Sequence, residues 1–177
     1  MKSFFFARCV PLVLLLSACT PPHATPPASP PLKVVTLDQT TKIVTGQTIY
    51  VPIYSQIYMW DQHRTMDLTA TLSIRNTDLT HPIIVAAVNY YDSRGQQVRK
   101  YLEQPVELGP LSSTNFVVDQ QDSSGGAGSA FIVEWIAQKQ VTNPVVESVM
   151  INTSGNQGLS FMSQGRVIKQ HPPGKGT

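Results

Sequence analysis

Between Leu68 and Arg75 the sequence alternates strictly between apolar and polar residues. A period of two places one set of side chains on each face of an extended strand, as in a half-buried β-strand. No stretch of ten or more residues keeps the 3.6-residue period of an amphipathic helix. Further candidate strands cover 83–91, 97–102, 115–118, 131–137, 145–151, 159–162 and 166–168. The chain is therefore expected to form an all-β domain.

Seven to nine short strands separated by turns favour an antiparallel β-sandwich of immunoglobulin or fibronectin-III type. A small closed β-barrel is the alternative. Pro52, between two apolar pairs, predicts an edge strand or a bulge. The tetrapeptide 92–95 ends in Gly95 and predicts a type I turn, with a returning strand over 97–102. We expect the sandwich to span residues 34–170 and the Pro- and Gly-rich residues 171–177 to form a flexible tail.

The first 18 residues resemble the signal peptide of a bacterial lipoprotein. Lys2 precedes an apolar core from Phe4 to Ser17, and the small residues Ser17 and Ala18 stand before Cys19. This pattern predicts that residues 1–18 are removed and that Cys19 becomes the acylated N-terminus. An ordinary secretory signal or a short membrane anchor is the alternative. The apolar run is shorter than the roughly 20 residues that a spanning helix needs.

Residues 19–33 are expected to be the lipidated cysteine and a tether. Six prolines stand among residues 20–33, which favours a semi-rigid polyproline segment about 40 Å long. We expect the domain to be held at a membrane by lipid on Cys19, facing the periplasm or the cell exterior. The residue after Cys19 is Thr20. This resembles the sequence of lipoproteins sorted to the outer membrane more than that of lipoproteins retained in the inner membrane, in which an Asp at this position is the familiar signal.

Charge and cysteine content limit the classes of partner and the kinds of site that the chain can have. Loss of Lys2 and Arg8 with the signal leaves 11 basic and 11 acidic residues. This balance argues against nucleic acid, because phosphate binding depends on clustered cations. Cys9 would also be lost, so no thiol remains for a disulfide or a Cys-based metal site. The expected partners are the bilayer and an unidentified envelope protein or glycan, and no cofactor is expected.

Several segments, in order from Gly46 to Ile168, resemble a bacterial family of predicted lipoproteins known as domain of unknown function 3124. They are residues 46–52 (GQTIYVP), 54–55, 72–78 (LSIRNTD), 90–92 (YYD) with 95, 124–126 (SGG) with 128, 131–135 (FIVEW), 147–151 (ESVMI) and 157–161 (QGLSF). The resemblance implies a single extracytoplasmic domain. It implies no activity, because the family has none assigned.

Met59, Trp60, His63 and Met66 form the cluster with the most ligand character. Thioether and imidazole groups suit Cu(I). Met59 and His63 share one parity of a strand while Met66 has the other, so a metal site would need a loop to bring them together. The alternative is a turn with one packed Trp and ordinary apolar Met side chains.

Glu134 lies between Ile132 and Ile136 on one face of a predicted core strand. A carboxylate among apolar neighbours is costly unless it is paired. We expect a structural ion pair between Glu134 and Arg75. The alternative is a general acid with a raised pKa.

The remaining chemistry-bearing residues favour binding over catalysis. Asp119 and Asp122 with the Gly-rich run 123–129 predict a mobile hairpin loop, since the ligand pattern of a calcium loop is absent. No Gly-x-Ser-x-Gly elbow occurs, and no catalytic residue is predicted. The sequence favours a non-catalytic binding sandwich. A periplasmic metal-handling or hydrolytic protein is the alternative.

Overall fold

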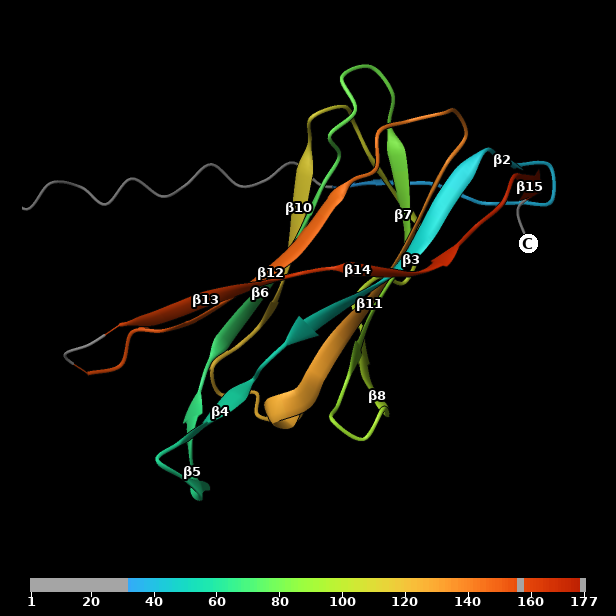
Figure 1. Cartoon of the computed structure of the whole chain (residues 1–177). Helices are drawn as coiled ribbons and strands as arrows, with labels where there is room; N and C mark the ends of the chain where they lie inside the picture. Colours follow the sequence, from blue (N-terminus) through green and yellow to red (C-terminus); the bar gives the residue numbers. More distant parts are fainter. Residues whose placement is uncertain (1–31, 156–157, 176–177) are drawn as a thin grey trace, which may run out of the picture. The chain divides into compact units, whose positions relative to one another are not determined.

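The computed structural model describes residues 32–155 and 158–175. Two antiparallel sheets dominate this part of the chain (Figure 1). The larger, seven-stranded sheet has the order β1 (Lys33–Val34), β9 (Val106–Leu108), β7 (Ile83–Tyr91), β11 (Ser129–Ala137), β3 (Thr45–Ile53) and β14 (Arg166–Gln170), with β8 (Gln97–Lys100) also paired to β7. The smaller sheet has the order β10 (Ser113–Val118), β6 (Thr69–Arg75), β12 (Val145–Asn152) and β13 (Leu159–Gln164).

Two small two-stranded sheets complete the strand pairing of the described residues. Strands β4 (Gln56–Met59) and β5 (Asp61–Asp67) form a separate hairpin, and β2 (Lys42–Ile43) pairs with β15 (Gly174–Lys175). A single 3-10 turn, η1, covers Gly126–Gly128. The expected all-β antiparallel sandwich is confirmed, and the sheets do not close into a barrel. Among the described residues, no helix is long and apolar enough to cross a bilayer.

The core lies between the two sheets. Alternation along β11 buries Phe131, Val133 and Trp135, while Ile132 and Glu134 on the other face are only half-buried. The Trp135 indole Nε1 donates to Gln47 Oε1 at 3.2 Å, so its one polar atom is satisfied. Leu72, Ile74 and Met150 close the core from the smaller sheet. These faces are those that the alternation predicts.

The last two long strands join the sheets along one side. β13 belongs to the smaller sheet and β14 to the larger, with only Gly165 between them. The Gly165 N–H donates to Val146 O at 2.8 Å, and a Cβ here would lie 2.6 Å from Ile49 Cγ2. Ser148 Oγ also links the sheets by donating to Pro52 O at 2.8 Å. Only glycine allows the chain to cross so close to β3.

Two local predictions are confirmed. β14 pairs with β3 only from Gln47 to Tyr50, so among the described residues no strand pairs with that side of β3 at Pro52. Gly95 has φ +77°, and its N–H donates to Asp92 O at 3.0 Å, which closes the turn between β7 and β8.

Both ends of the expected domain need correction. Lys33, assigned to the tether, pairs with Glu107 in the larger sheet and reaches its carboxylate at 3.0 Å. Residues 171–175 of the expected flexible tail are tied down as well. The His171 N–H donates to Gly46 O at 2.9 Å, and β15 pairs with β2. Backbone pairing can stabilise a Pro- and Gly-rich segment whose side chains give no periodic signal.

Candidate binding site

The predicted lipidation site, Cys19, lies outside the described residues, as do the signal peptide and the tether up to residue 31. Its acylation stays a prediction from the sequence.

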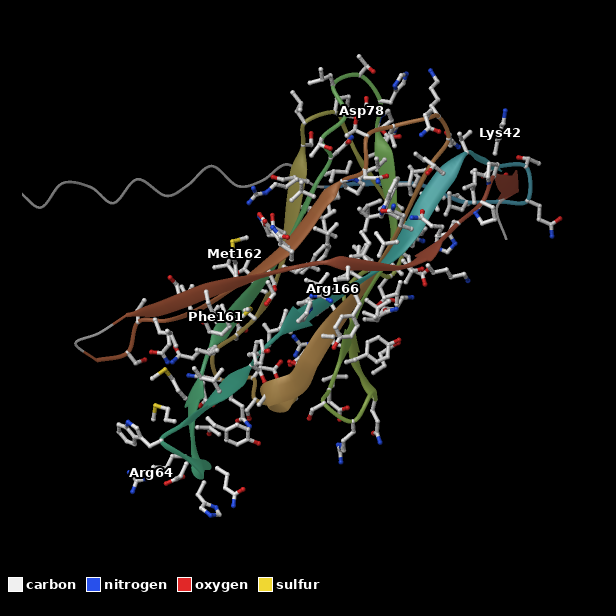
Figure 2. The ribbon with its side chains drawn as sticks, viewed as in Figure 1. Lys42, Arg64, Asp78, Phe161, Met162 and Arg166 are labelled. Atoms are coloured by element: carbon white, nitrogen blue, oxygen red, sulfur yellow. The ribbon has the colours of Figure 1, made fainter. Side chains whose placement is uncertain are left out.

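The β4–β5 hairpin carries the candidate copper ligands. Met66 packs against the core, whereas His63 is exposed. Trp60, expected to be packed, is instead 86% exposed at the turn, with φ +58°. The Arg64 guanidinium lies 5.6 Å from its ring centroid, and Figure 2 shows Arg64 at the far end of the hairpin. A site formed by Met59, His63 and Met66 stays a prediction that this arrangement does not favour.

The proposed ion pair between Arg75 and Glu134 is not formed. Arg75 Nη2 lies 3.2 Å from Glu147 Oε1 on the neighbouring strand β12. Glu134 lies in the larger sheet, opposite Thr48 and Ala87, on the face away from the core. Within the described residues Glu134 has no cation within 4.0 Å. The expected pair fails because β6 and β11 belong to different sheets. Arg75 and Glu134 both point outward, on opposite faces of the sandwich.

The Gly-rich loop is docked rather than mobile. Its Gly125 carbonyl accepts from the Ser93 N–H at 3.0 Å, and Ser55 Oγ donates to Gly126 O at 3.1 Å. Asp122, considered as a calcium ligand, forms an ion pair with Arg99 at 2.6 Å. Although partial burial raises it, hydrogen bonds from Ser124 and Arg99 hold the pKa of Asp122 below its ordinary value. The loop's polar groups are thus used to hold the fold.

The loop 76–82, which we call the amide-anchored loop, is likewise structural. Asn76 Nδ2 donates to three carbonyls, those of His81, Leu108 and Gly109, at 2.9–3.1 Å. Asp78 accepts backbone N–H bonds from Thr80, His81 and Thr142. These bonds, led by the one from Thr80, hold the pKa of Asp78 far below its ordinary value.

A cluster of metal ligands and a histidine beside a hydroxyl are two further kinds of candidate site. Residues 32–155 and 158–175 contain no group of three or more His, Cys, Asp or Glu side chains that could hold a metal. Thr48 Oγ1 lies 2.9 Å from His171 Nε2, but no carboxylate in the described part of the chain is hydrogen-bonded to that imidazole. The Thr48–His171 contact therefore lacks, among the described residues, the carboxylate that orients the histidine of a catalytic triad.

The outward face of the larger sheet carries a hollow of about 400 Å³, which we call the tyrosine hollow. Tyr50 of β3 and Tyr91 of β7 line it, and Ile132 and Ala130 of β11 lie between them. Residues 92, 93 and 95 of the β7–β8 turn and Gly128 of η1 complete the lining. Alternation explains the outward tyrosine, because Ile49 and Val51 on either side of Tyr50 are buried.

The polar groups around the tyrosine hollow are largely occupied. Asp92 accepts the N–H groups of Arg94 and Gln96, both at 2.9 Å. The bond from Gln96 is the main reason that the pKa of Asp92 lies below its ordinary value. The Tyr91 hydroxyl donates to Gln97 Oε1 at 3.3 Å, while Tyr50 is 37% exposed. The hollow therefore offers aromatic and apolar surface, with little that could activate a nucleophile.

Residues 46–168 match the family described as "Protein of unknown function (DUF3124)". The chain belongs to this family. No curated protein matches it. Among solved structures, the "Crystal Structure of Thermotoga maritima 1070" is similar with a TM-score of 0.42 and 13% identity, over 68% of this chain and 92% of that chain.

Four of the eight segments through which the sequence resembles DUF3124 meet at the tyrosine hollow. Six of its eight lining residues stand in them: Tyr50, Tyr91, Asp92, Gly95, Gly128 and Ile132. Two other hollows, one beside Lys42 and Lys139 and one beside Tyr101 and Gln104, take no lining residue from these segments. Sequence reasoning missed Tyr50 and Tyr91 as site residues, although their outward parity in apolar strands was a usable signal.

Proposed function

We propose that this DUF3124 protein is a lipid-anchored, extracytoplasmic lipoprotein whose sandwich binds an envelope component, a protein or a glycan, in the tyrosine hollow without catalysing a reaction. The observation that carries the binding role is the aromatic, outward-facing hollow, all of whose lining residues lie within the part of the chain that matches the family. Ligand sites are mostly apolar and aromatic, with a few polar groups that orient the ligand.

Tyrosine suits such a site because its ring is apolar and its hydroxyl is polar. Tyr50 and Tyr91 lie on different strands of one sheet and are separated by β11, so the backbone ladder fixes their spacing. A site on paired strands is better preorganised than one on a loop. We infer that binding needs little rearrangement of this face.

The anchoring role rests on the sequence from Leu16 to Cys19 and on the Pro-rich segment that follows. Two or more acyl chains would hold the protein at the bilayer, because each buried CH₂ contributes about 0.8 kcal/mol. We propose a periplasm-facing position, with the outer membrane favoured over the inner.

Anchoring is tested by Cys19→Ala. This variant should remain unprocessed at residue 18 and should be missing from the detergent-extracted lipoprotein fraction. Normal processing and unchanged detergent partitioning would reject Cys19 as the acylation site.

Binding is tested by photo-crosslinking in living cells. A photoreactive residue at position 132, inside the hollow, should give a discrete adduct that Tyr50→Ala removes. The matched control carries the same residue at position 117, which is exposed on the outward face of the other sheet. Equal adducts from both positions, or an adduct indifferent to Tyr50→Ala, would reject the hollow as the binding site.

A further inference from the structure

The free edge of β13 is the second surface that the fold leaves open. β13 ends the smaller sheet, and within the described residues no strand pairs with the side that faces away from β12. An edge strand presents unpaired backbone N–H and C=O groups to any other strand that reaches it. Proteins usually protect such edges with charge, irregular register, short length or a covering group.

The edges of the larger sheet carry such protection. β1 has only two residues, and β8 contains Arg99 and Lys100. β14 contains Arg166 and Lys169, and its pairing with β3 shifts register between Val167 and Lys169. Each of these edges therefore disfavours the addition of a further strand.

The opposite edge of the smaller sheet, β10, is covered by a side chain. The Tyr101 hydroxyl donates to the carbonyl of Val117 at 2.8 Å, and the Tyr101 ring packs edge-on against Phe116, with 5.6 Å between ring centroids. An incoming strand would have to displace this contact.

β13 has none of these devices. Its sequence, LSFMSQ, contains no charged residue and no proline, and its six residues pair with β12 without a register shift. Figure 2 shows Phe161 and Met162 on opposite sides of the strand. Phe161 packs against Tyr54 with 5.7 Å between ring centroids, whereas Met162 is 53% exposed on the outward face.

An apolar row crosses the outward face of the smaller sheet and ends at this edge. The strand registers place Val117, Thr71, Val149 and Met162 side by side on β10, β6, β12 and β13. The Val117, Val149 and Met162 side chains are all exposed. Thr71 interrupts the row, so its apolar part beside the free edge is formed by Val149 and Met162. Adjacent exposed apolar side chains of this kind are typical of a contact site.

We propose that the free edge of β13 binds β13 of a second copy of this chain, antiparallel and about a two-fold axis, with Met162 opposite Met162. Opposed residues of two antiparallel strands share a face, and this register sets Phe161 against Ser163 and Ser160 against Gln164. The apolar row then continues from one copy into the other.

The absence of charge on β13 allows a second copy to pair at this edge. Because β13 is uncharged, the two-fold arrangement brings no like charges together. Self-pairing of β8 or β14 would instead bring their cations close, and like charges directly opposite each other destabilise a strand pair. A closed two-fold contact uses the same patch on both copies and stops at a dimer.

The test uses the full-length chain in a nonionic detergent, with sedimentation followed over a range of concentrations. The wild type should form a reversible dimer. Met162→Lys and Met162→Glu should each weaken dimerisation at least about tenfold, because each loses an apolar contact and sets like charges opposite. An equimolar mixture of the two variants should recover most of the dimer. Val117→Lys, the same kind of change on the same face at the other edge, should leave dimerisation unchanged.

Three results would overturn the proposal. The first is a wild-type protein that stays monomeric at every concentration. This result would overturn the proposal even if the monomer bound an unrelated extended peptide at the β13 edge. The second is a loss of the dimer in Val117→Lys equal to that in Met162→Lys, and the third is a mixture that restores nothing. The mixture also separates a charge effect at the edge from misfolding, since two misfolded variants would not restore each other.

Discussion

The amide-anchored loop and the tyrosine hollow both contain residues of the segments that resemble the family, yet they use these residues in opposite ways. In the loop, Asn76 and Asp78 direct polar atoms to backbone groups of distant segments, at Leu108, Gly109 and Thr142. In the hollow, the Tyr50 and Tyr91 side chains line an open surface. The residues with the most conspicuous chemistry thus hold the fold, and the less conspicuous aromatic residues are left to meet a partner.

The largest effect is expected in the loop, for Asn76→Ala. Three carbonyls lose their side-chain donor in a buried region, which should lower the free energy of unfolding by about 2–3 kcal/mol. Thr77→Ala is the matched control, because Thr77 Oγ1 makes one exposed bond, to Asn143 O. Equal losses of stability for the two variants in urea unfolding would show that the hydrogen bonds of the Asn76 amide do not stabilise the loop.

The second prediction concerns pH. The folded-state pKa of Asp78 is lowered, so its contribution to stability is present above the ordinary carboxyl value of about 3.9 and is lost as pH falls through the folded value. The wild type should have a higher urea midpoint than Asp78→Asn at neutral pH, and this difference should shrink only below about pH 4. A difference that stays constant to about pH 2 would show that the charge of Asp78 is not responsible.

A smaller effect is expected for the ion pair beside the loop. Arg75 is half exposed where it meets Glu147, and exposed pairs contribute about 0.2–1 kcal/mol. A double-mutant cycle with Arg75→Met and Glu147→Gln should give a coupling in that range, whereas Glu134→Gln should show none with Arg75→Met. Coupling to Glu134 would restore the pairing that the strand arrangement excludes.

The smallest effect on stability is expected in the hollow. Tyr50 is partly exposed and makes no hydrogen bond through its hydroxyl within the described residues, so Tyr50→Ala should cost less than about 1 kcal/mol. Thermal and urea unfolding should therefore separate this variant clearly from Asn76→Ala. A loss as large as that of Asn76→Ala would make Tyr50 a structural residue like those of the loop.

Local patterns in the sequence predict much of this fold. Alternation along 68–75 and 131–137 identifies core strands and their buried faces, and the turn at Gly95 follows from its left-handed backbone. These features depend on neighbouring residues alone. The strand 61–67 escapes prediction because its residues are almost all polar and exposed, with pairing to β4 as the main constraint.

What the sequence does not predict depends on contacts between distant segments. The partner of Arg75 follows from the register of β6 with β12, about 70 residues away, and alternation contains no information on which strands pair. The docking of Gly125 beside the turn at Ser93 and the pairing of β15 with β2 are of the same kind. The tyrosine hollow was missed for the same reason, since β3, β7 and the Gly-rich loop meet only in the folded domain.

The central claim, that the tyrosine hollow is occupied in the envelope, is tested most directly by hydroxyl-radical footprinting of the wild-type protein. Tyr58, exposed on the β4–β5 hairpin, serves as the internal control. We predict that Tyr50 and Tyr91 are labelled less in intact envelopes than in the purified protein, while labelling of Tyr58 is unchanged. Equal labelling of Tyr50 and Tyr91 in the two preparations would contradict the account.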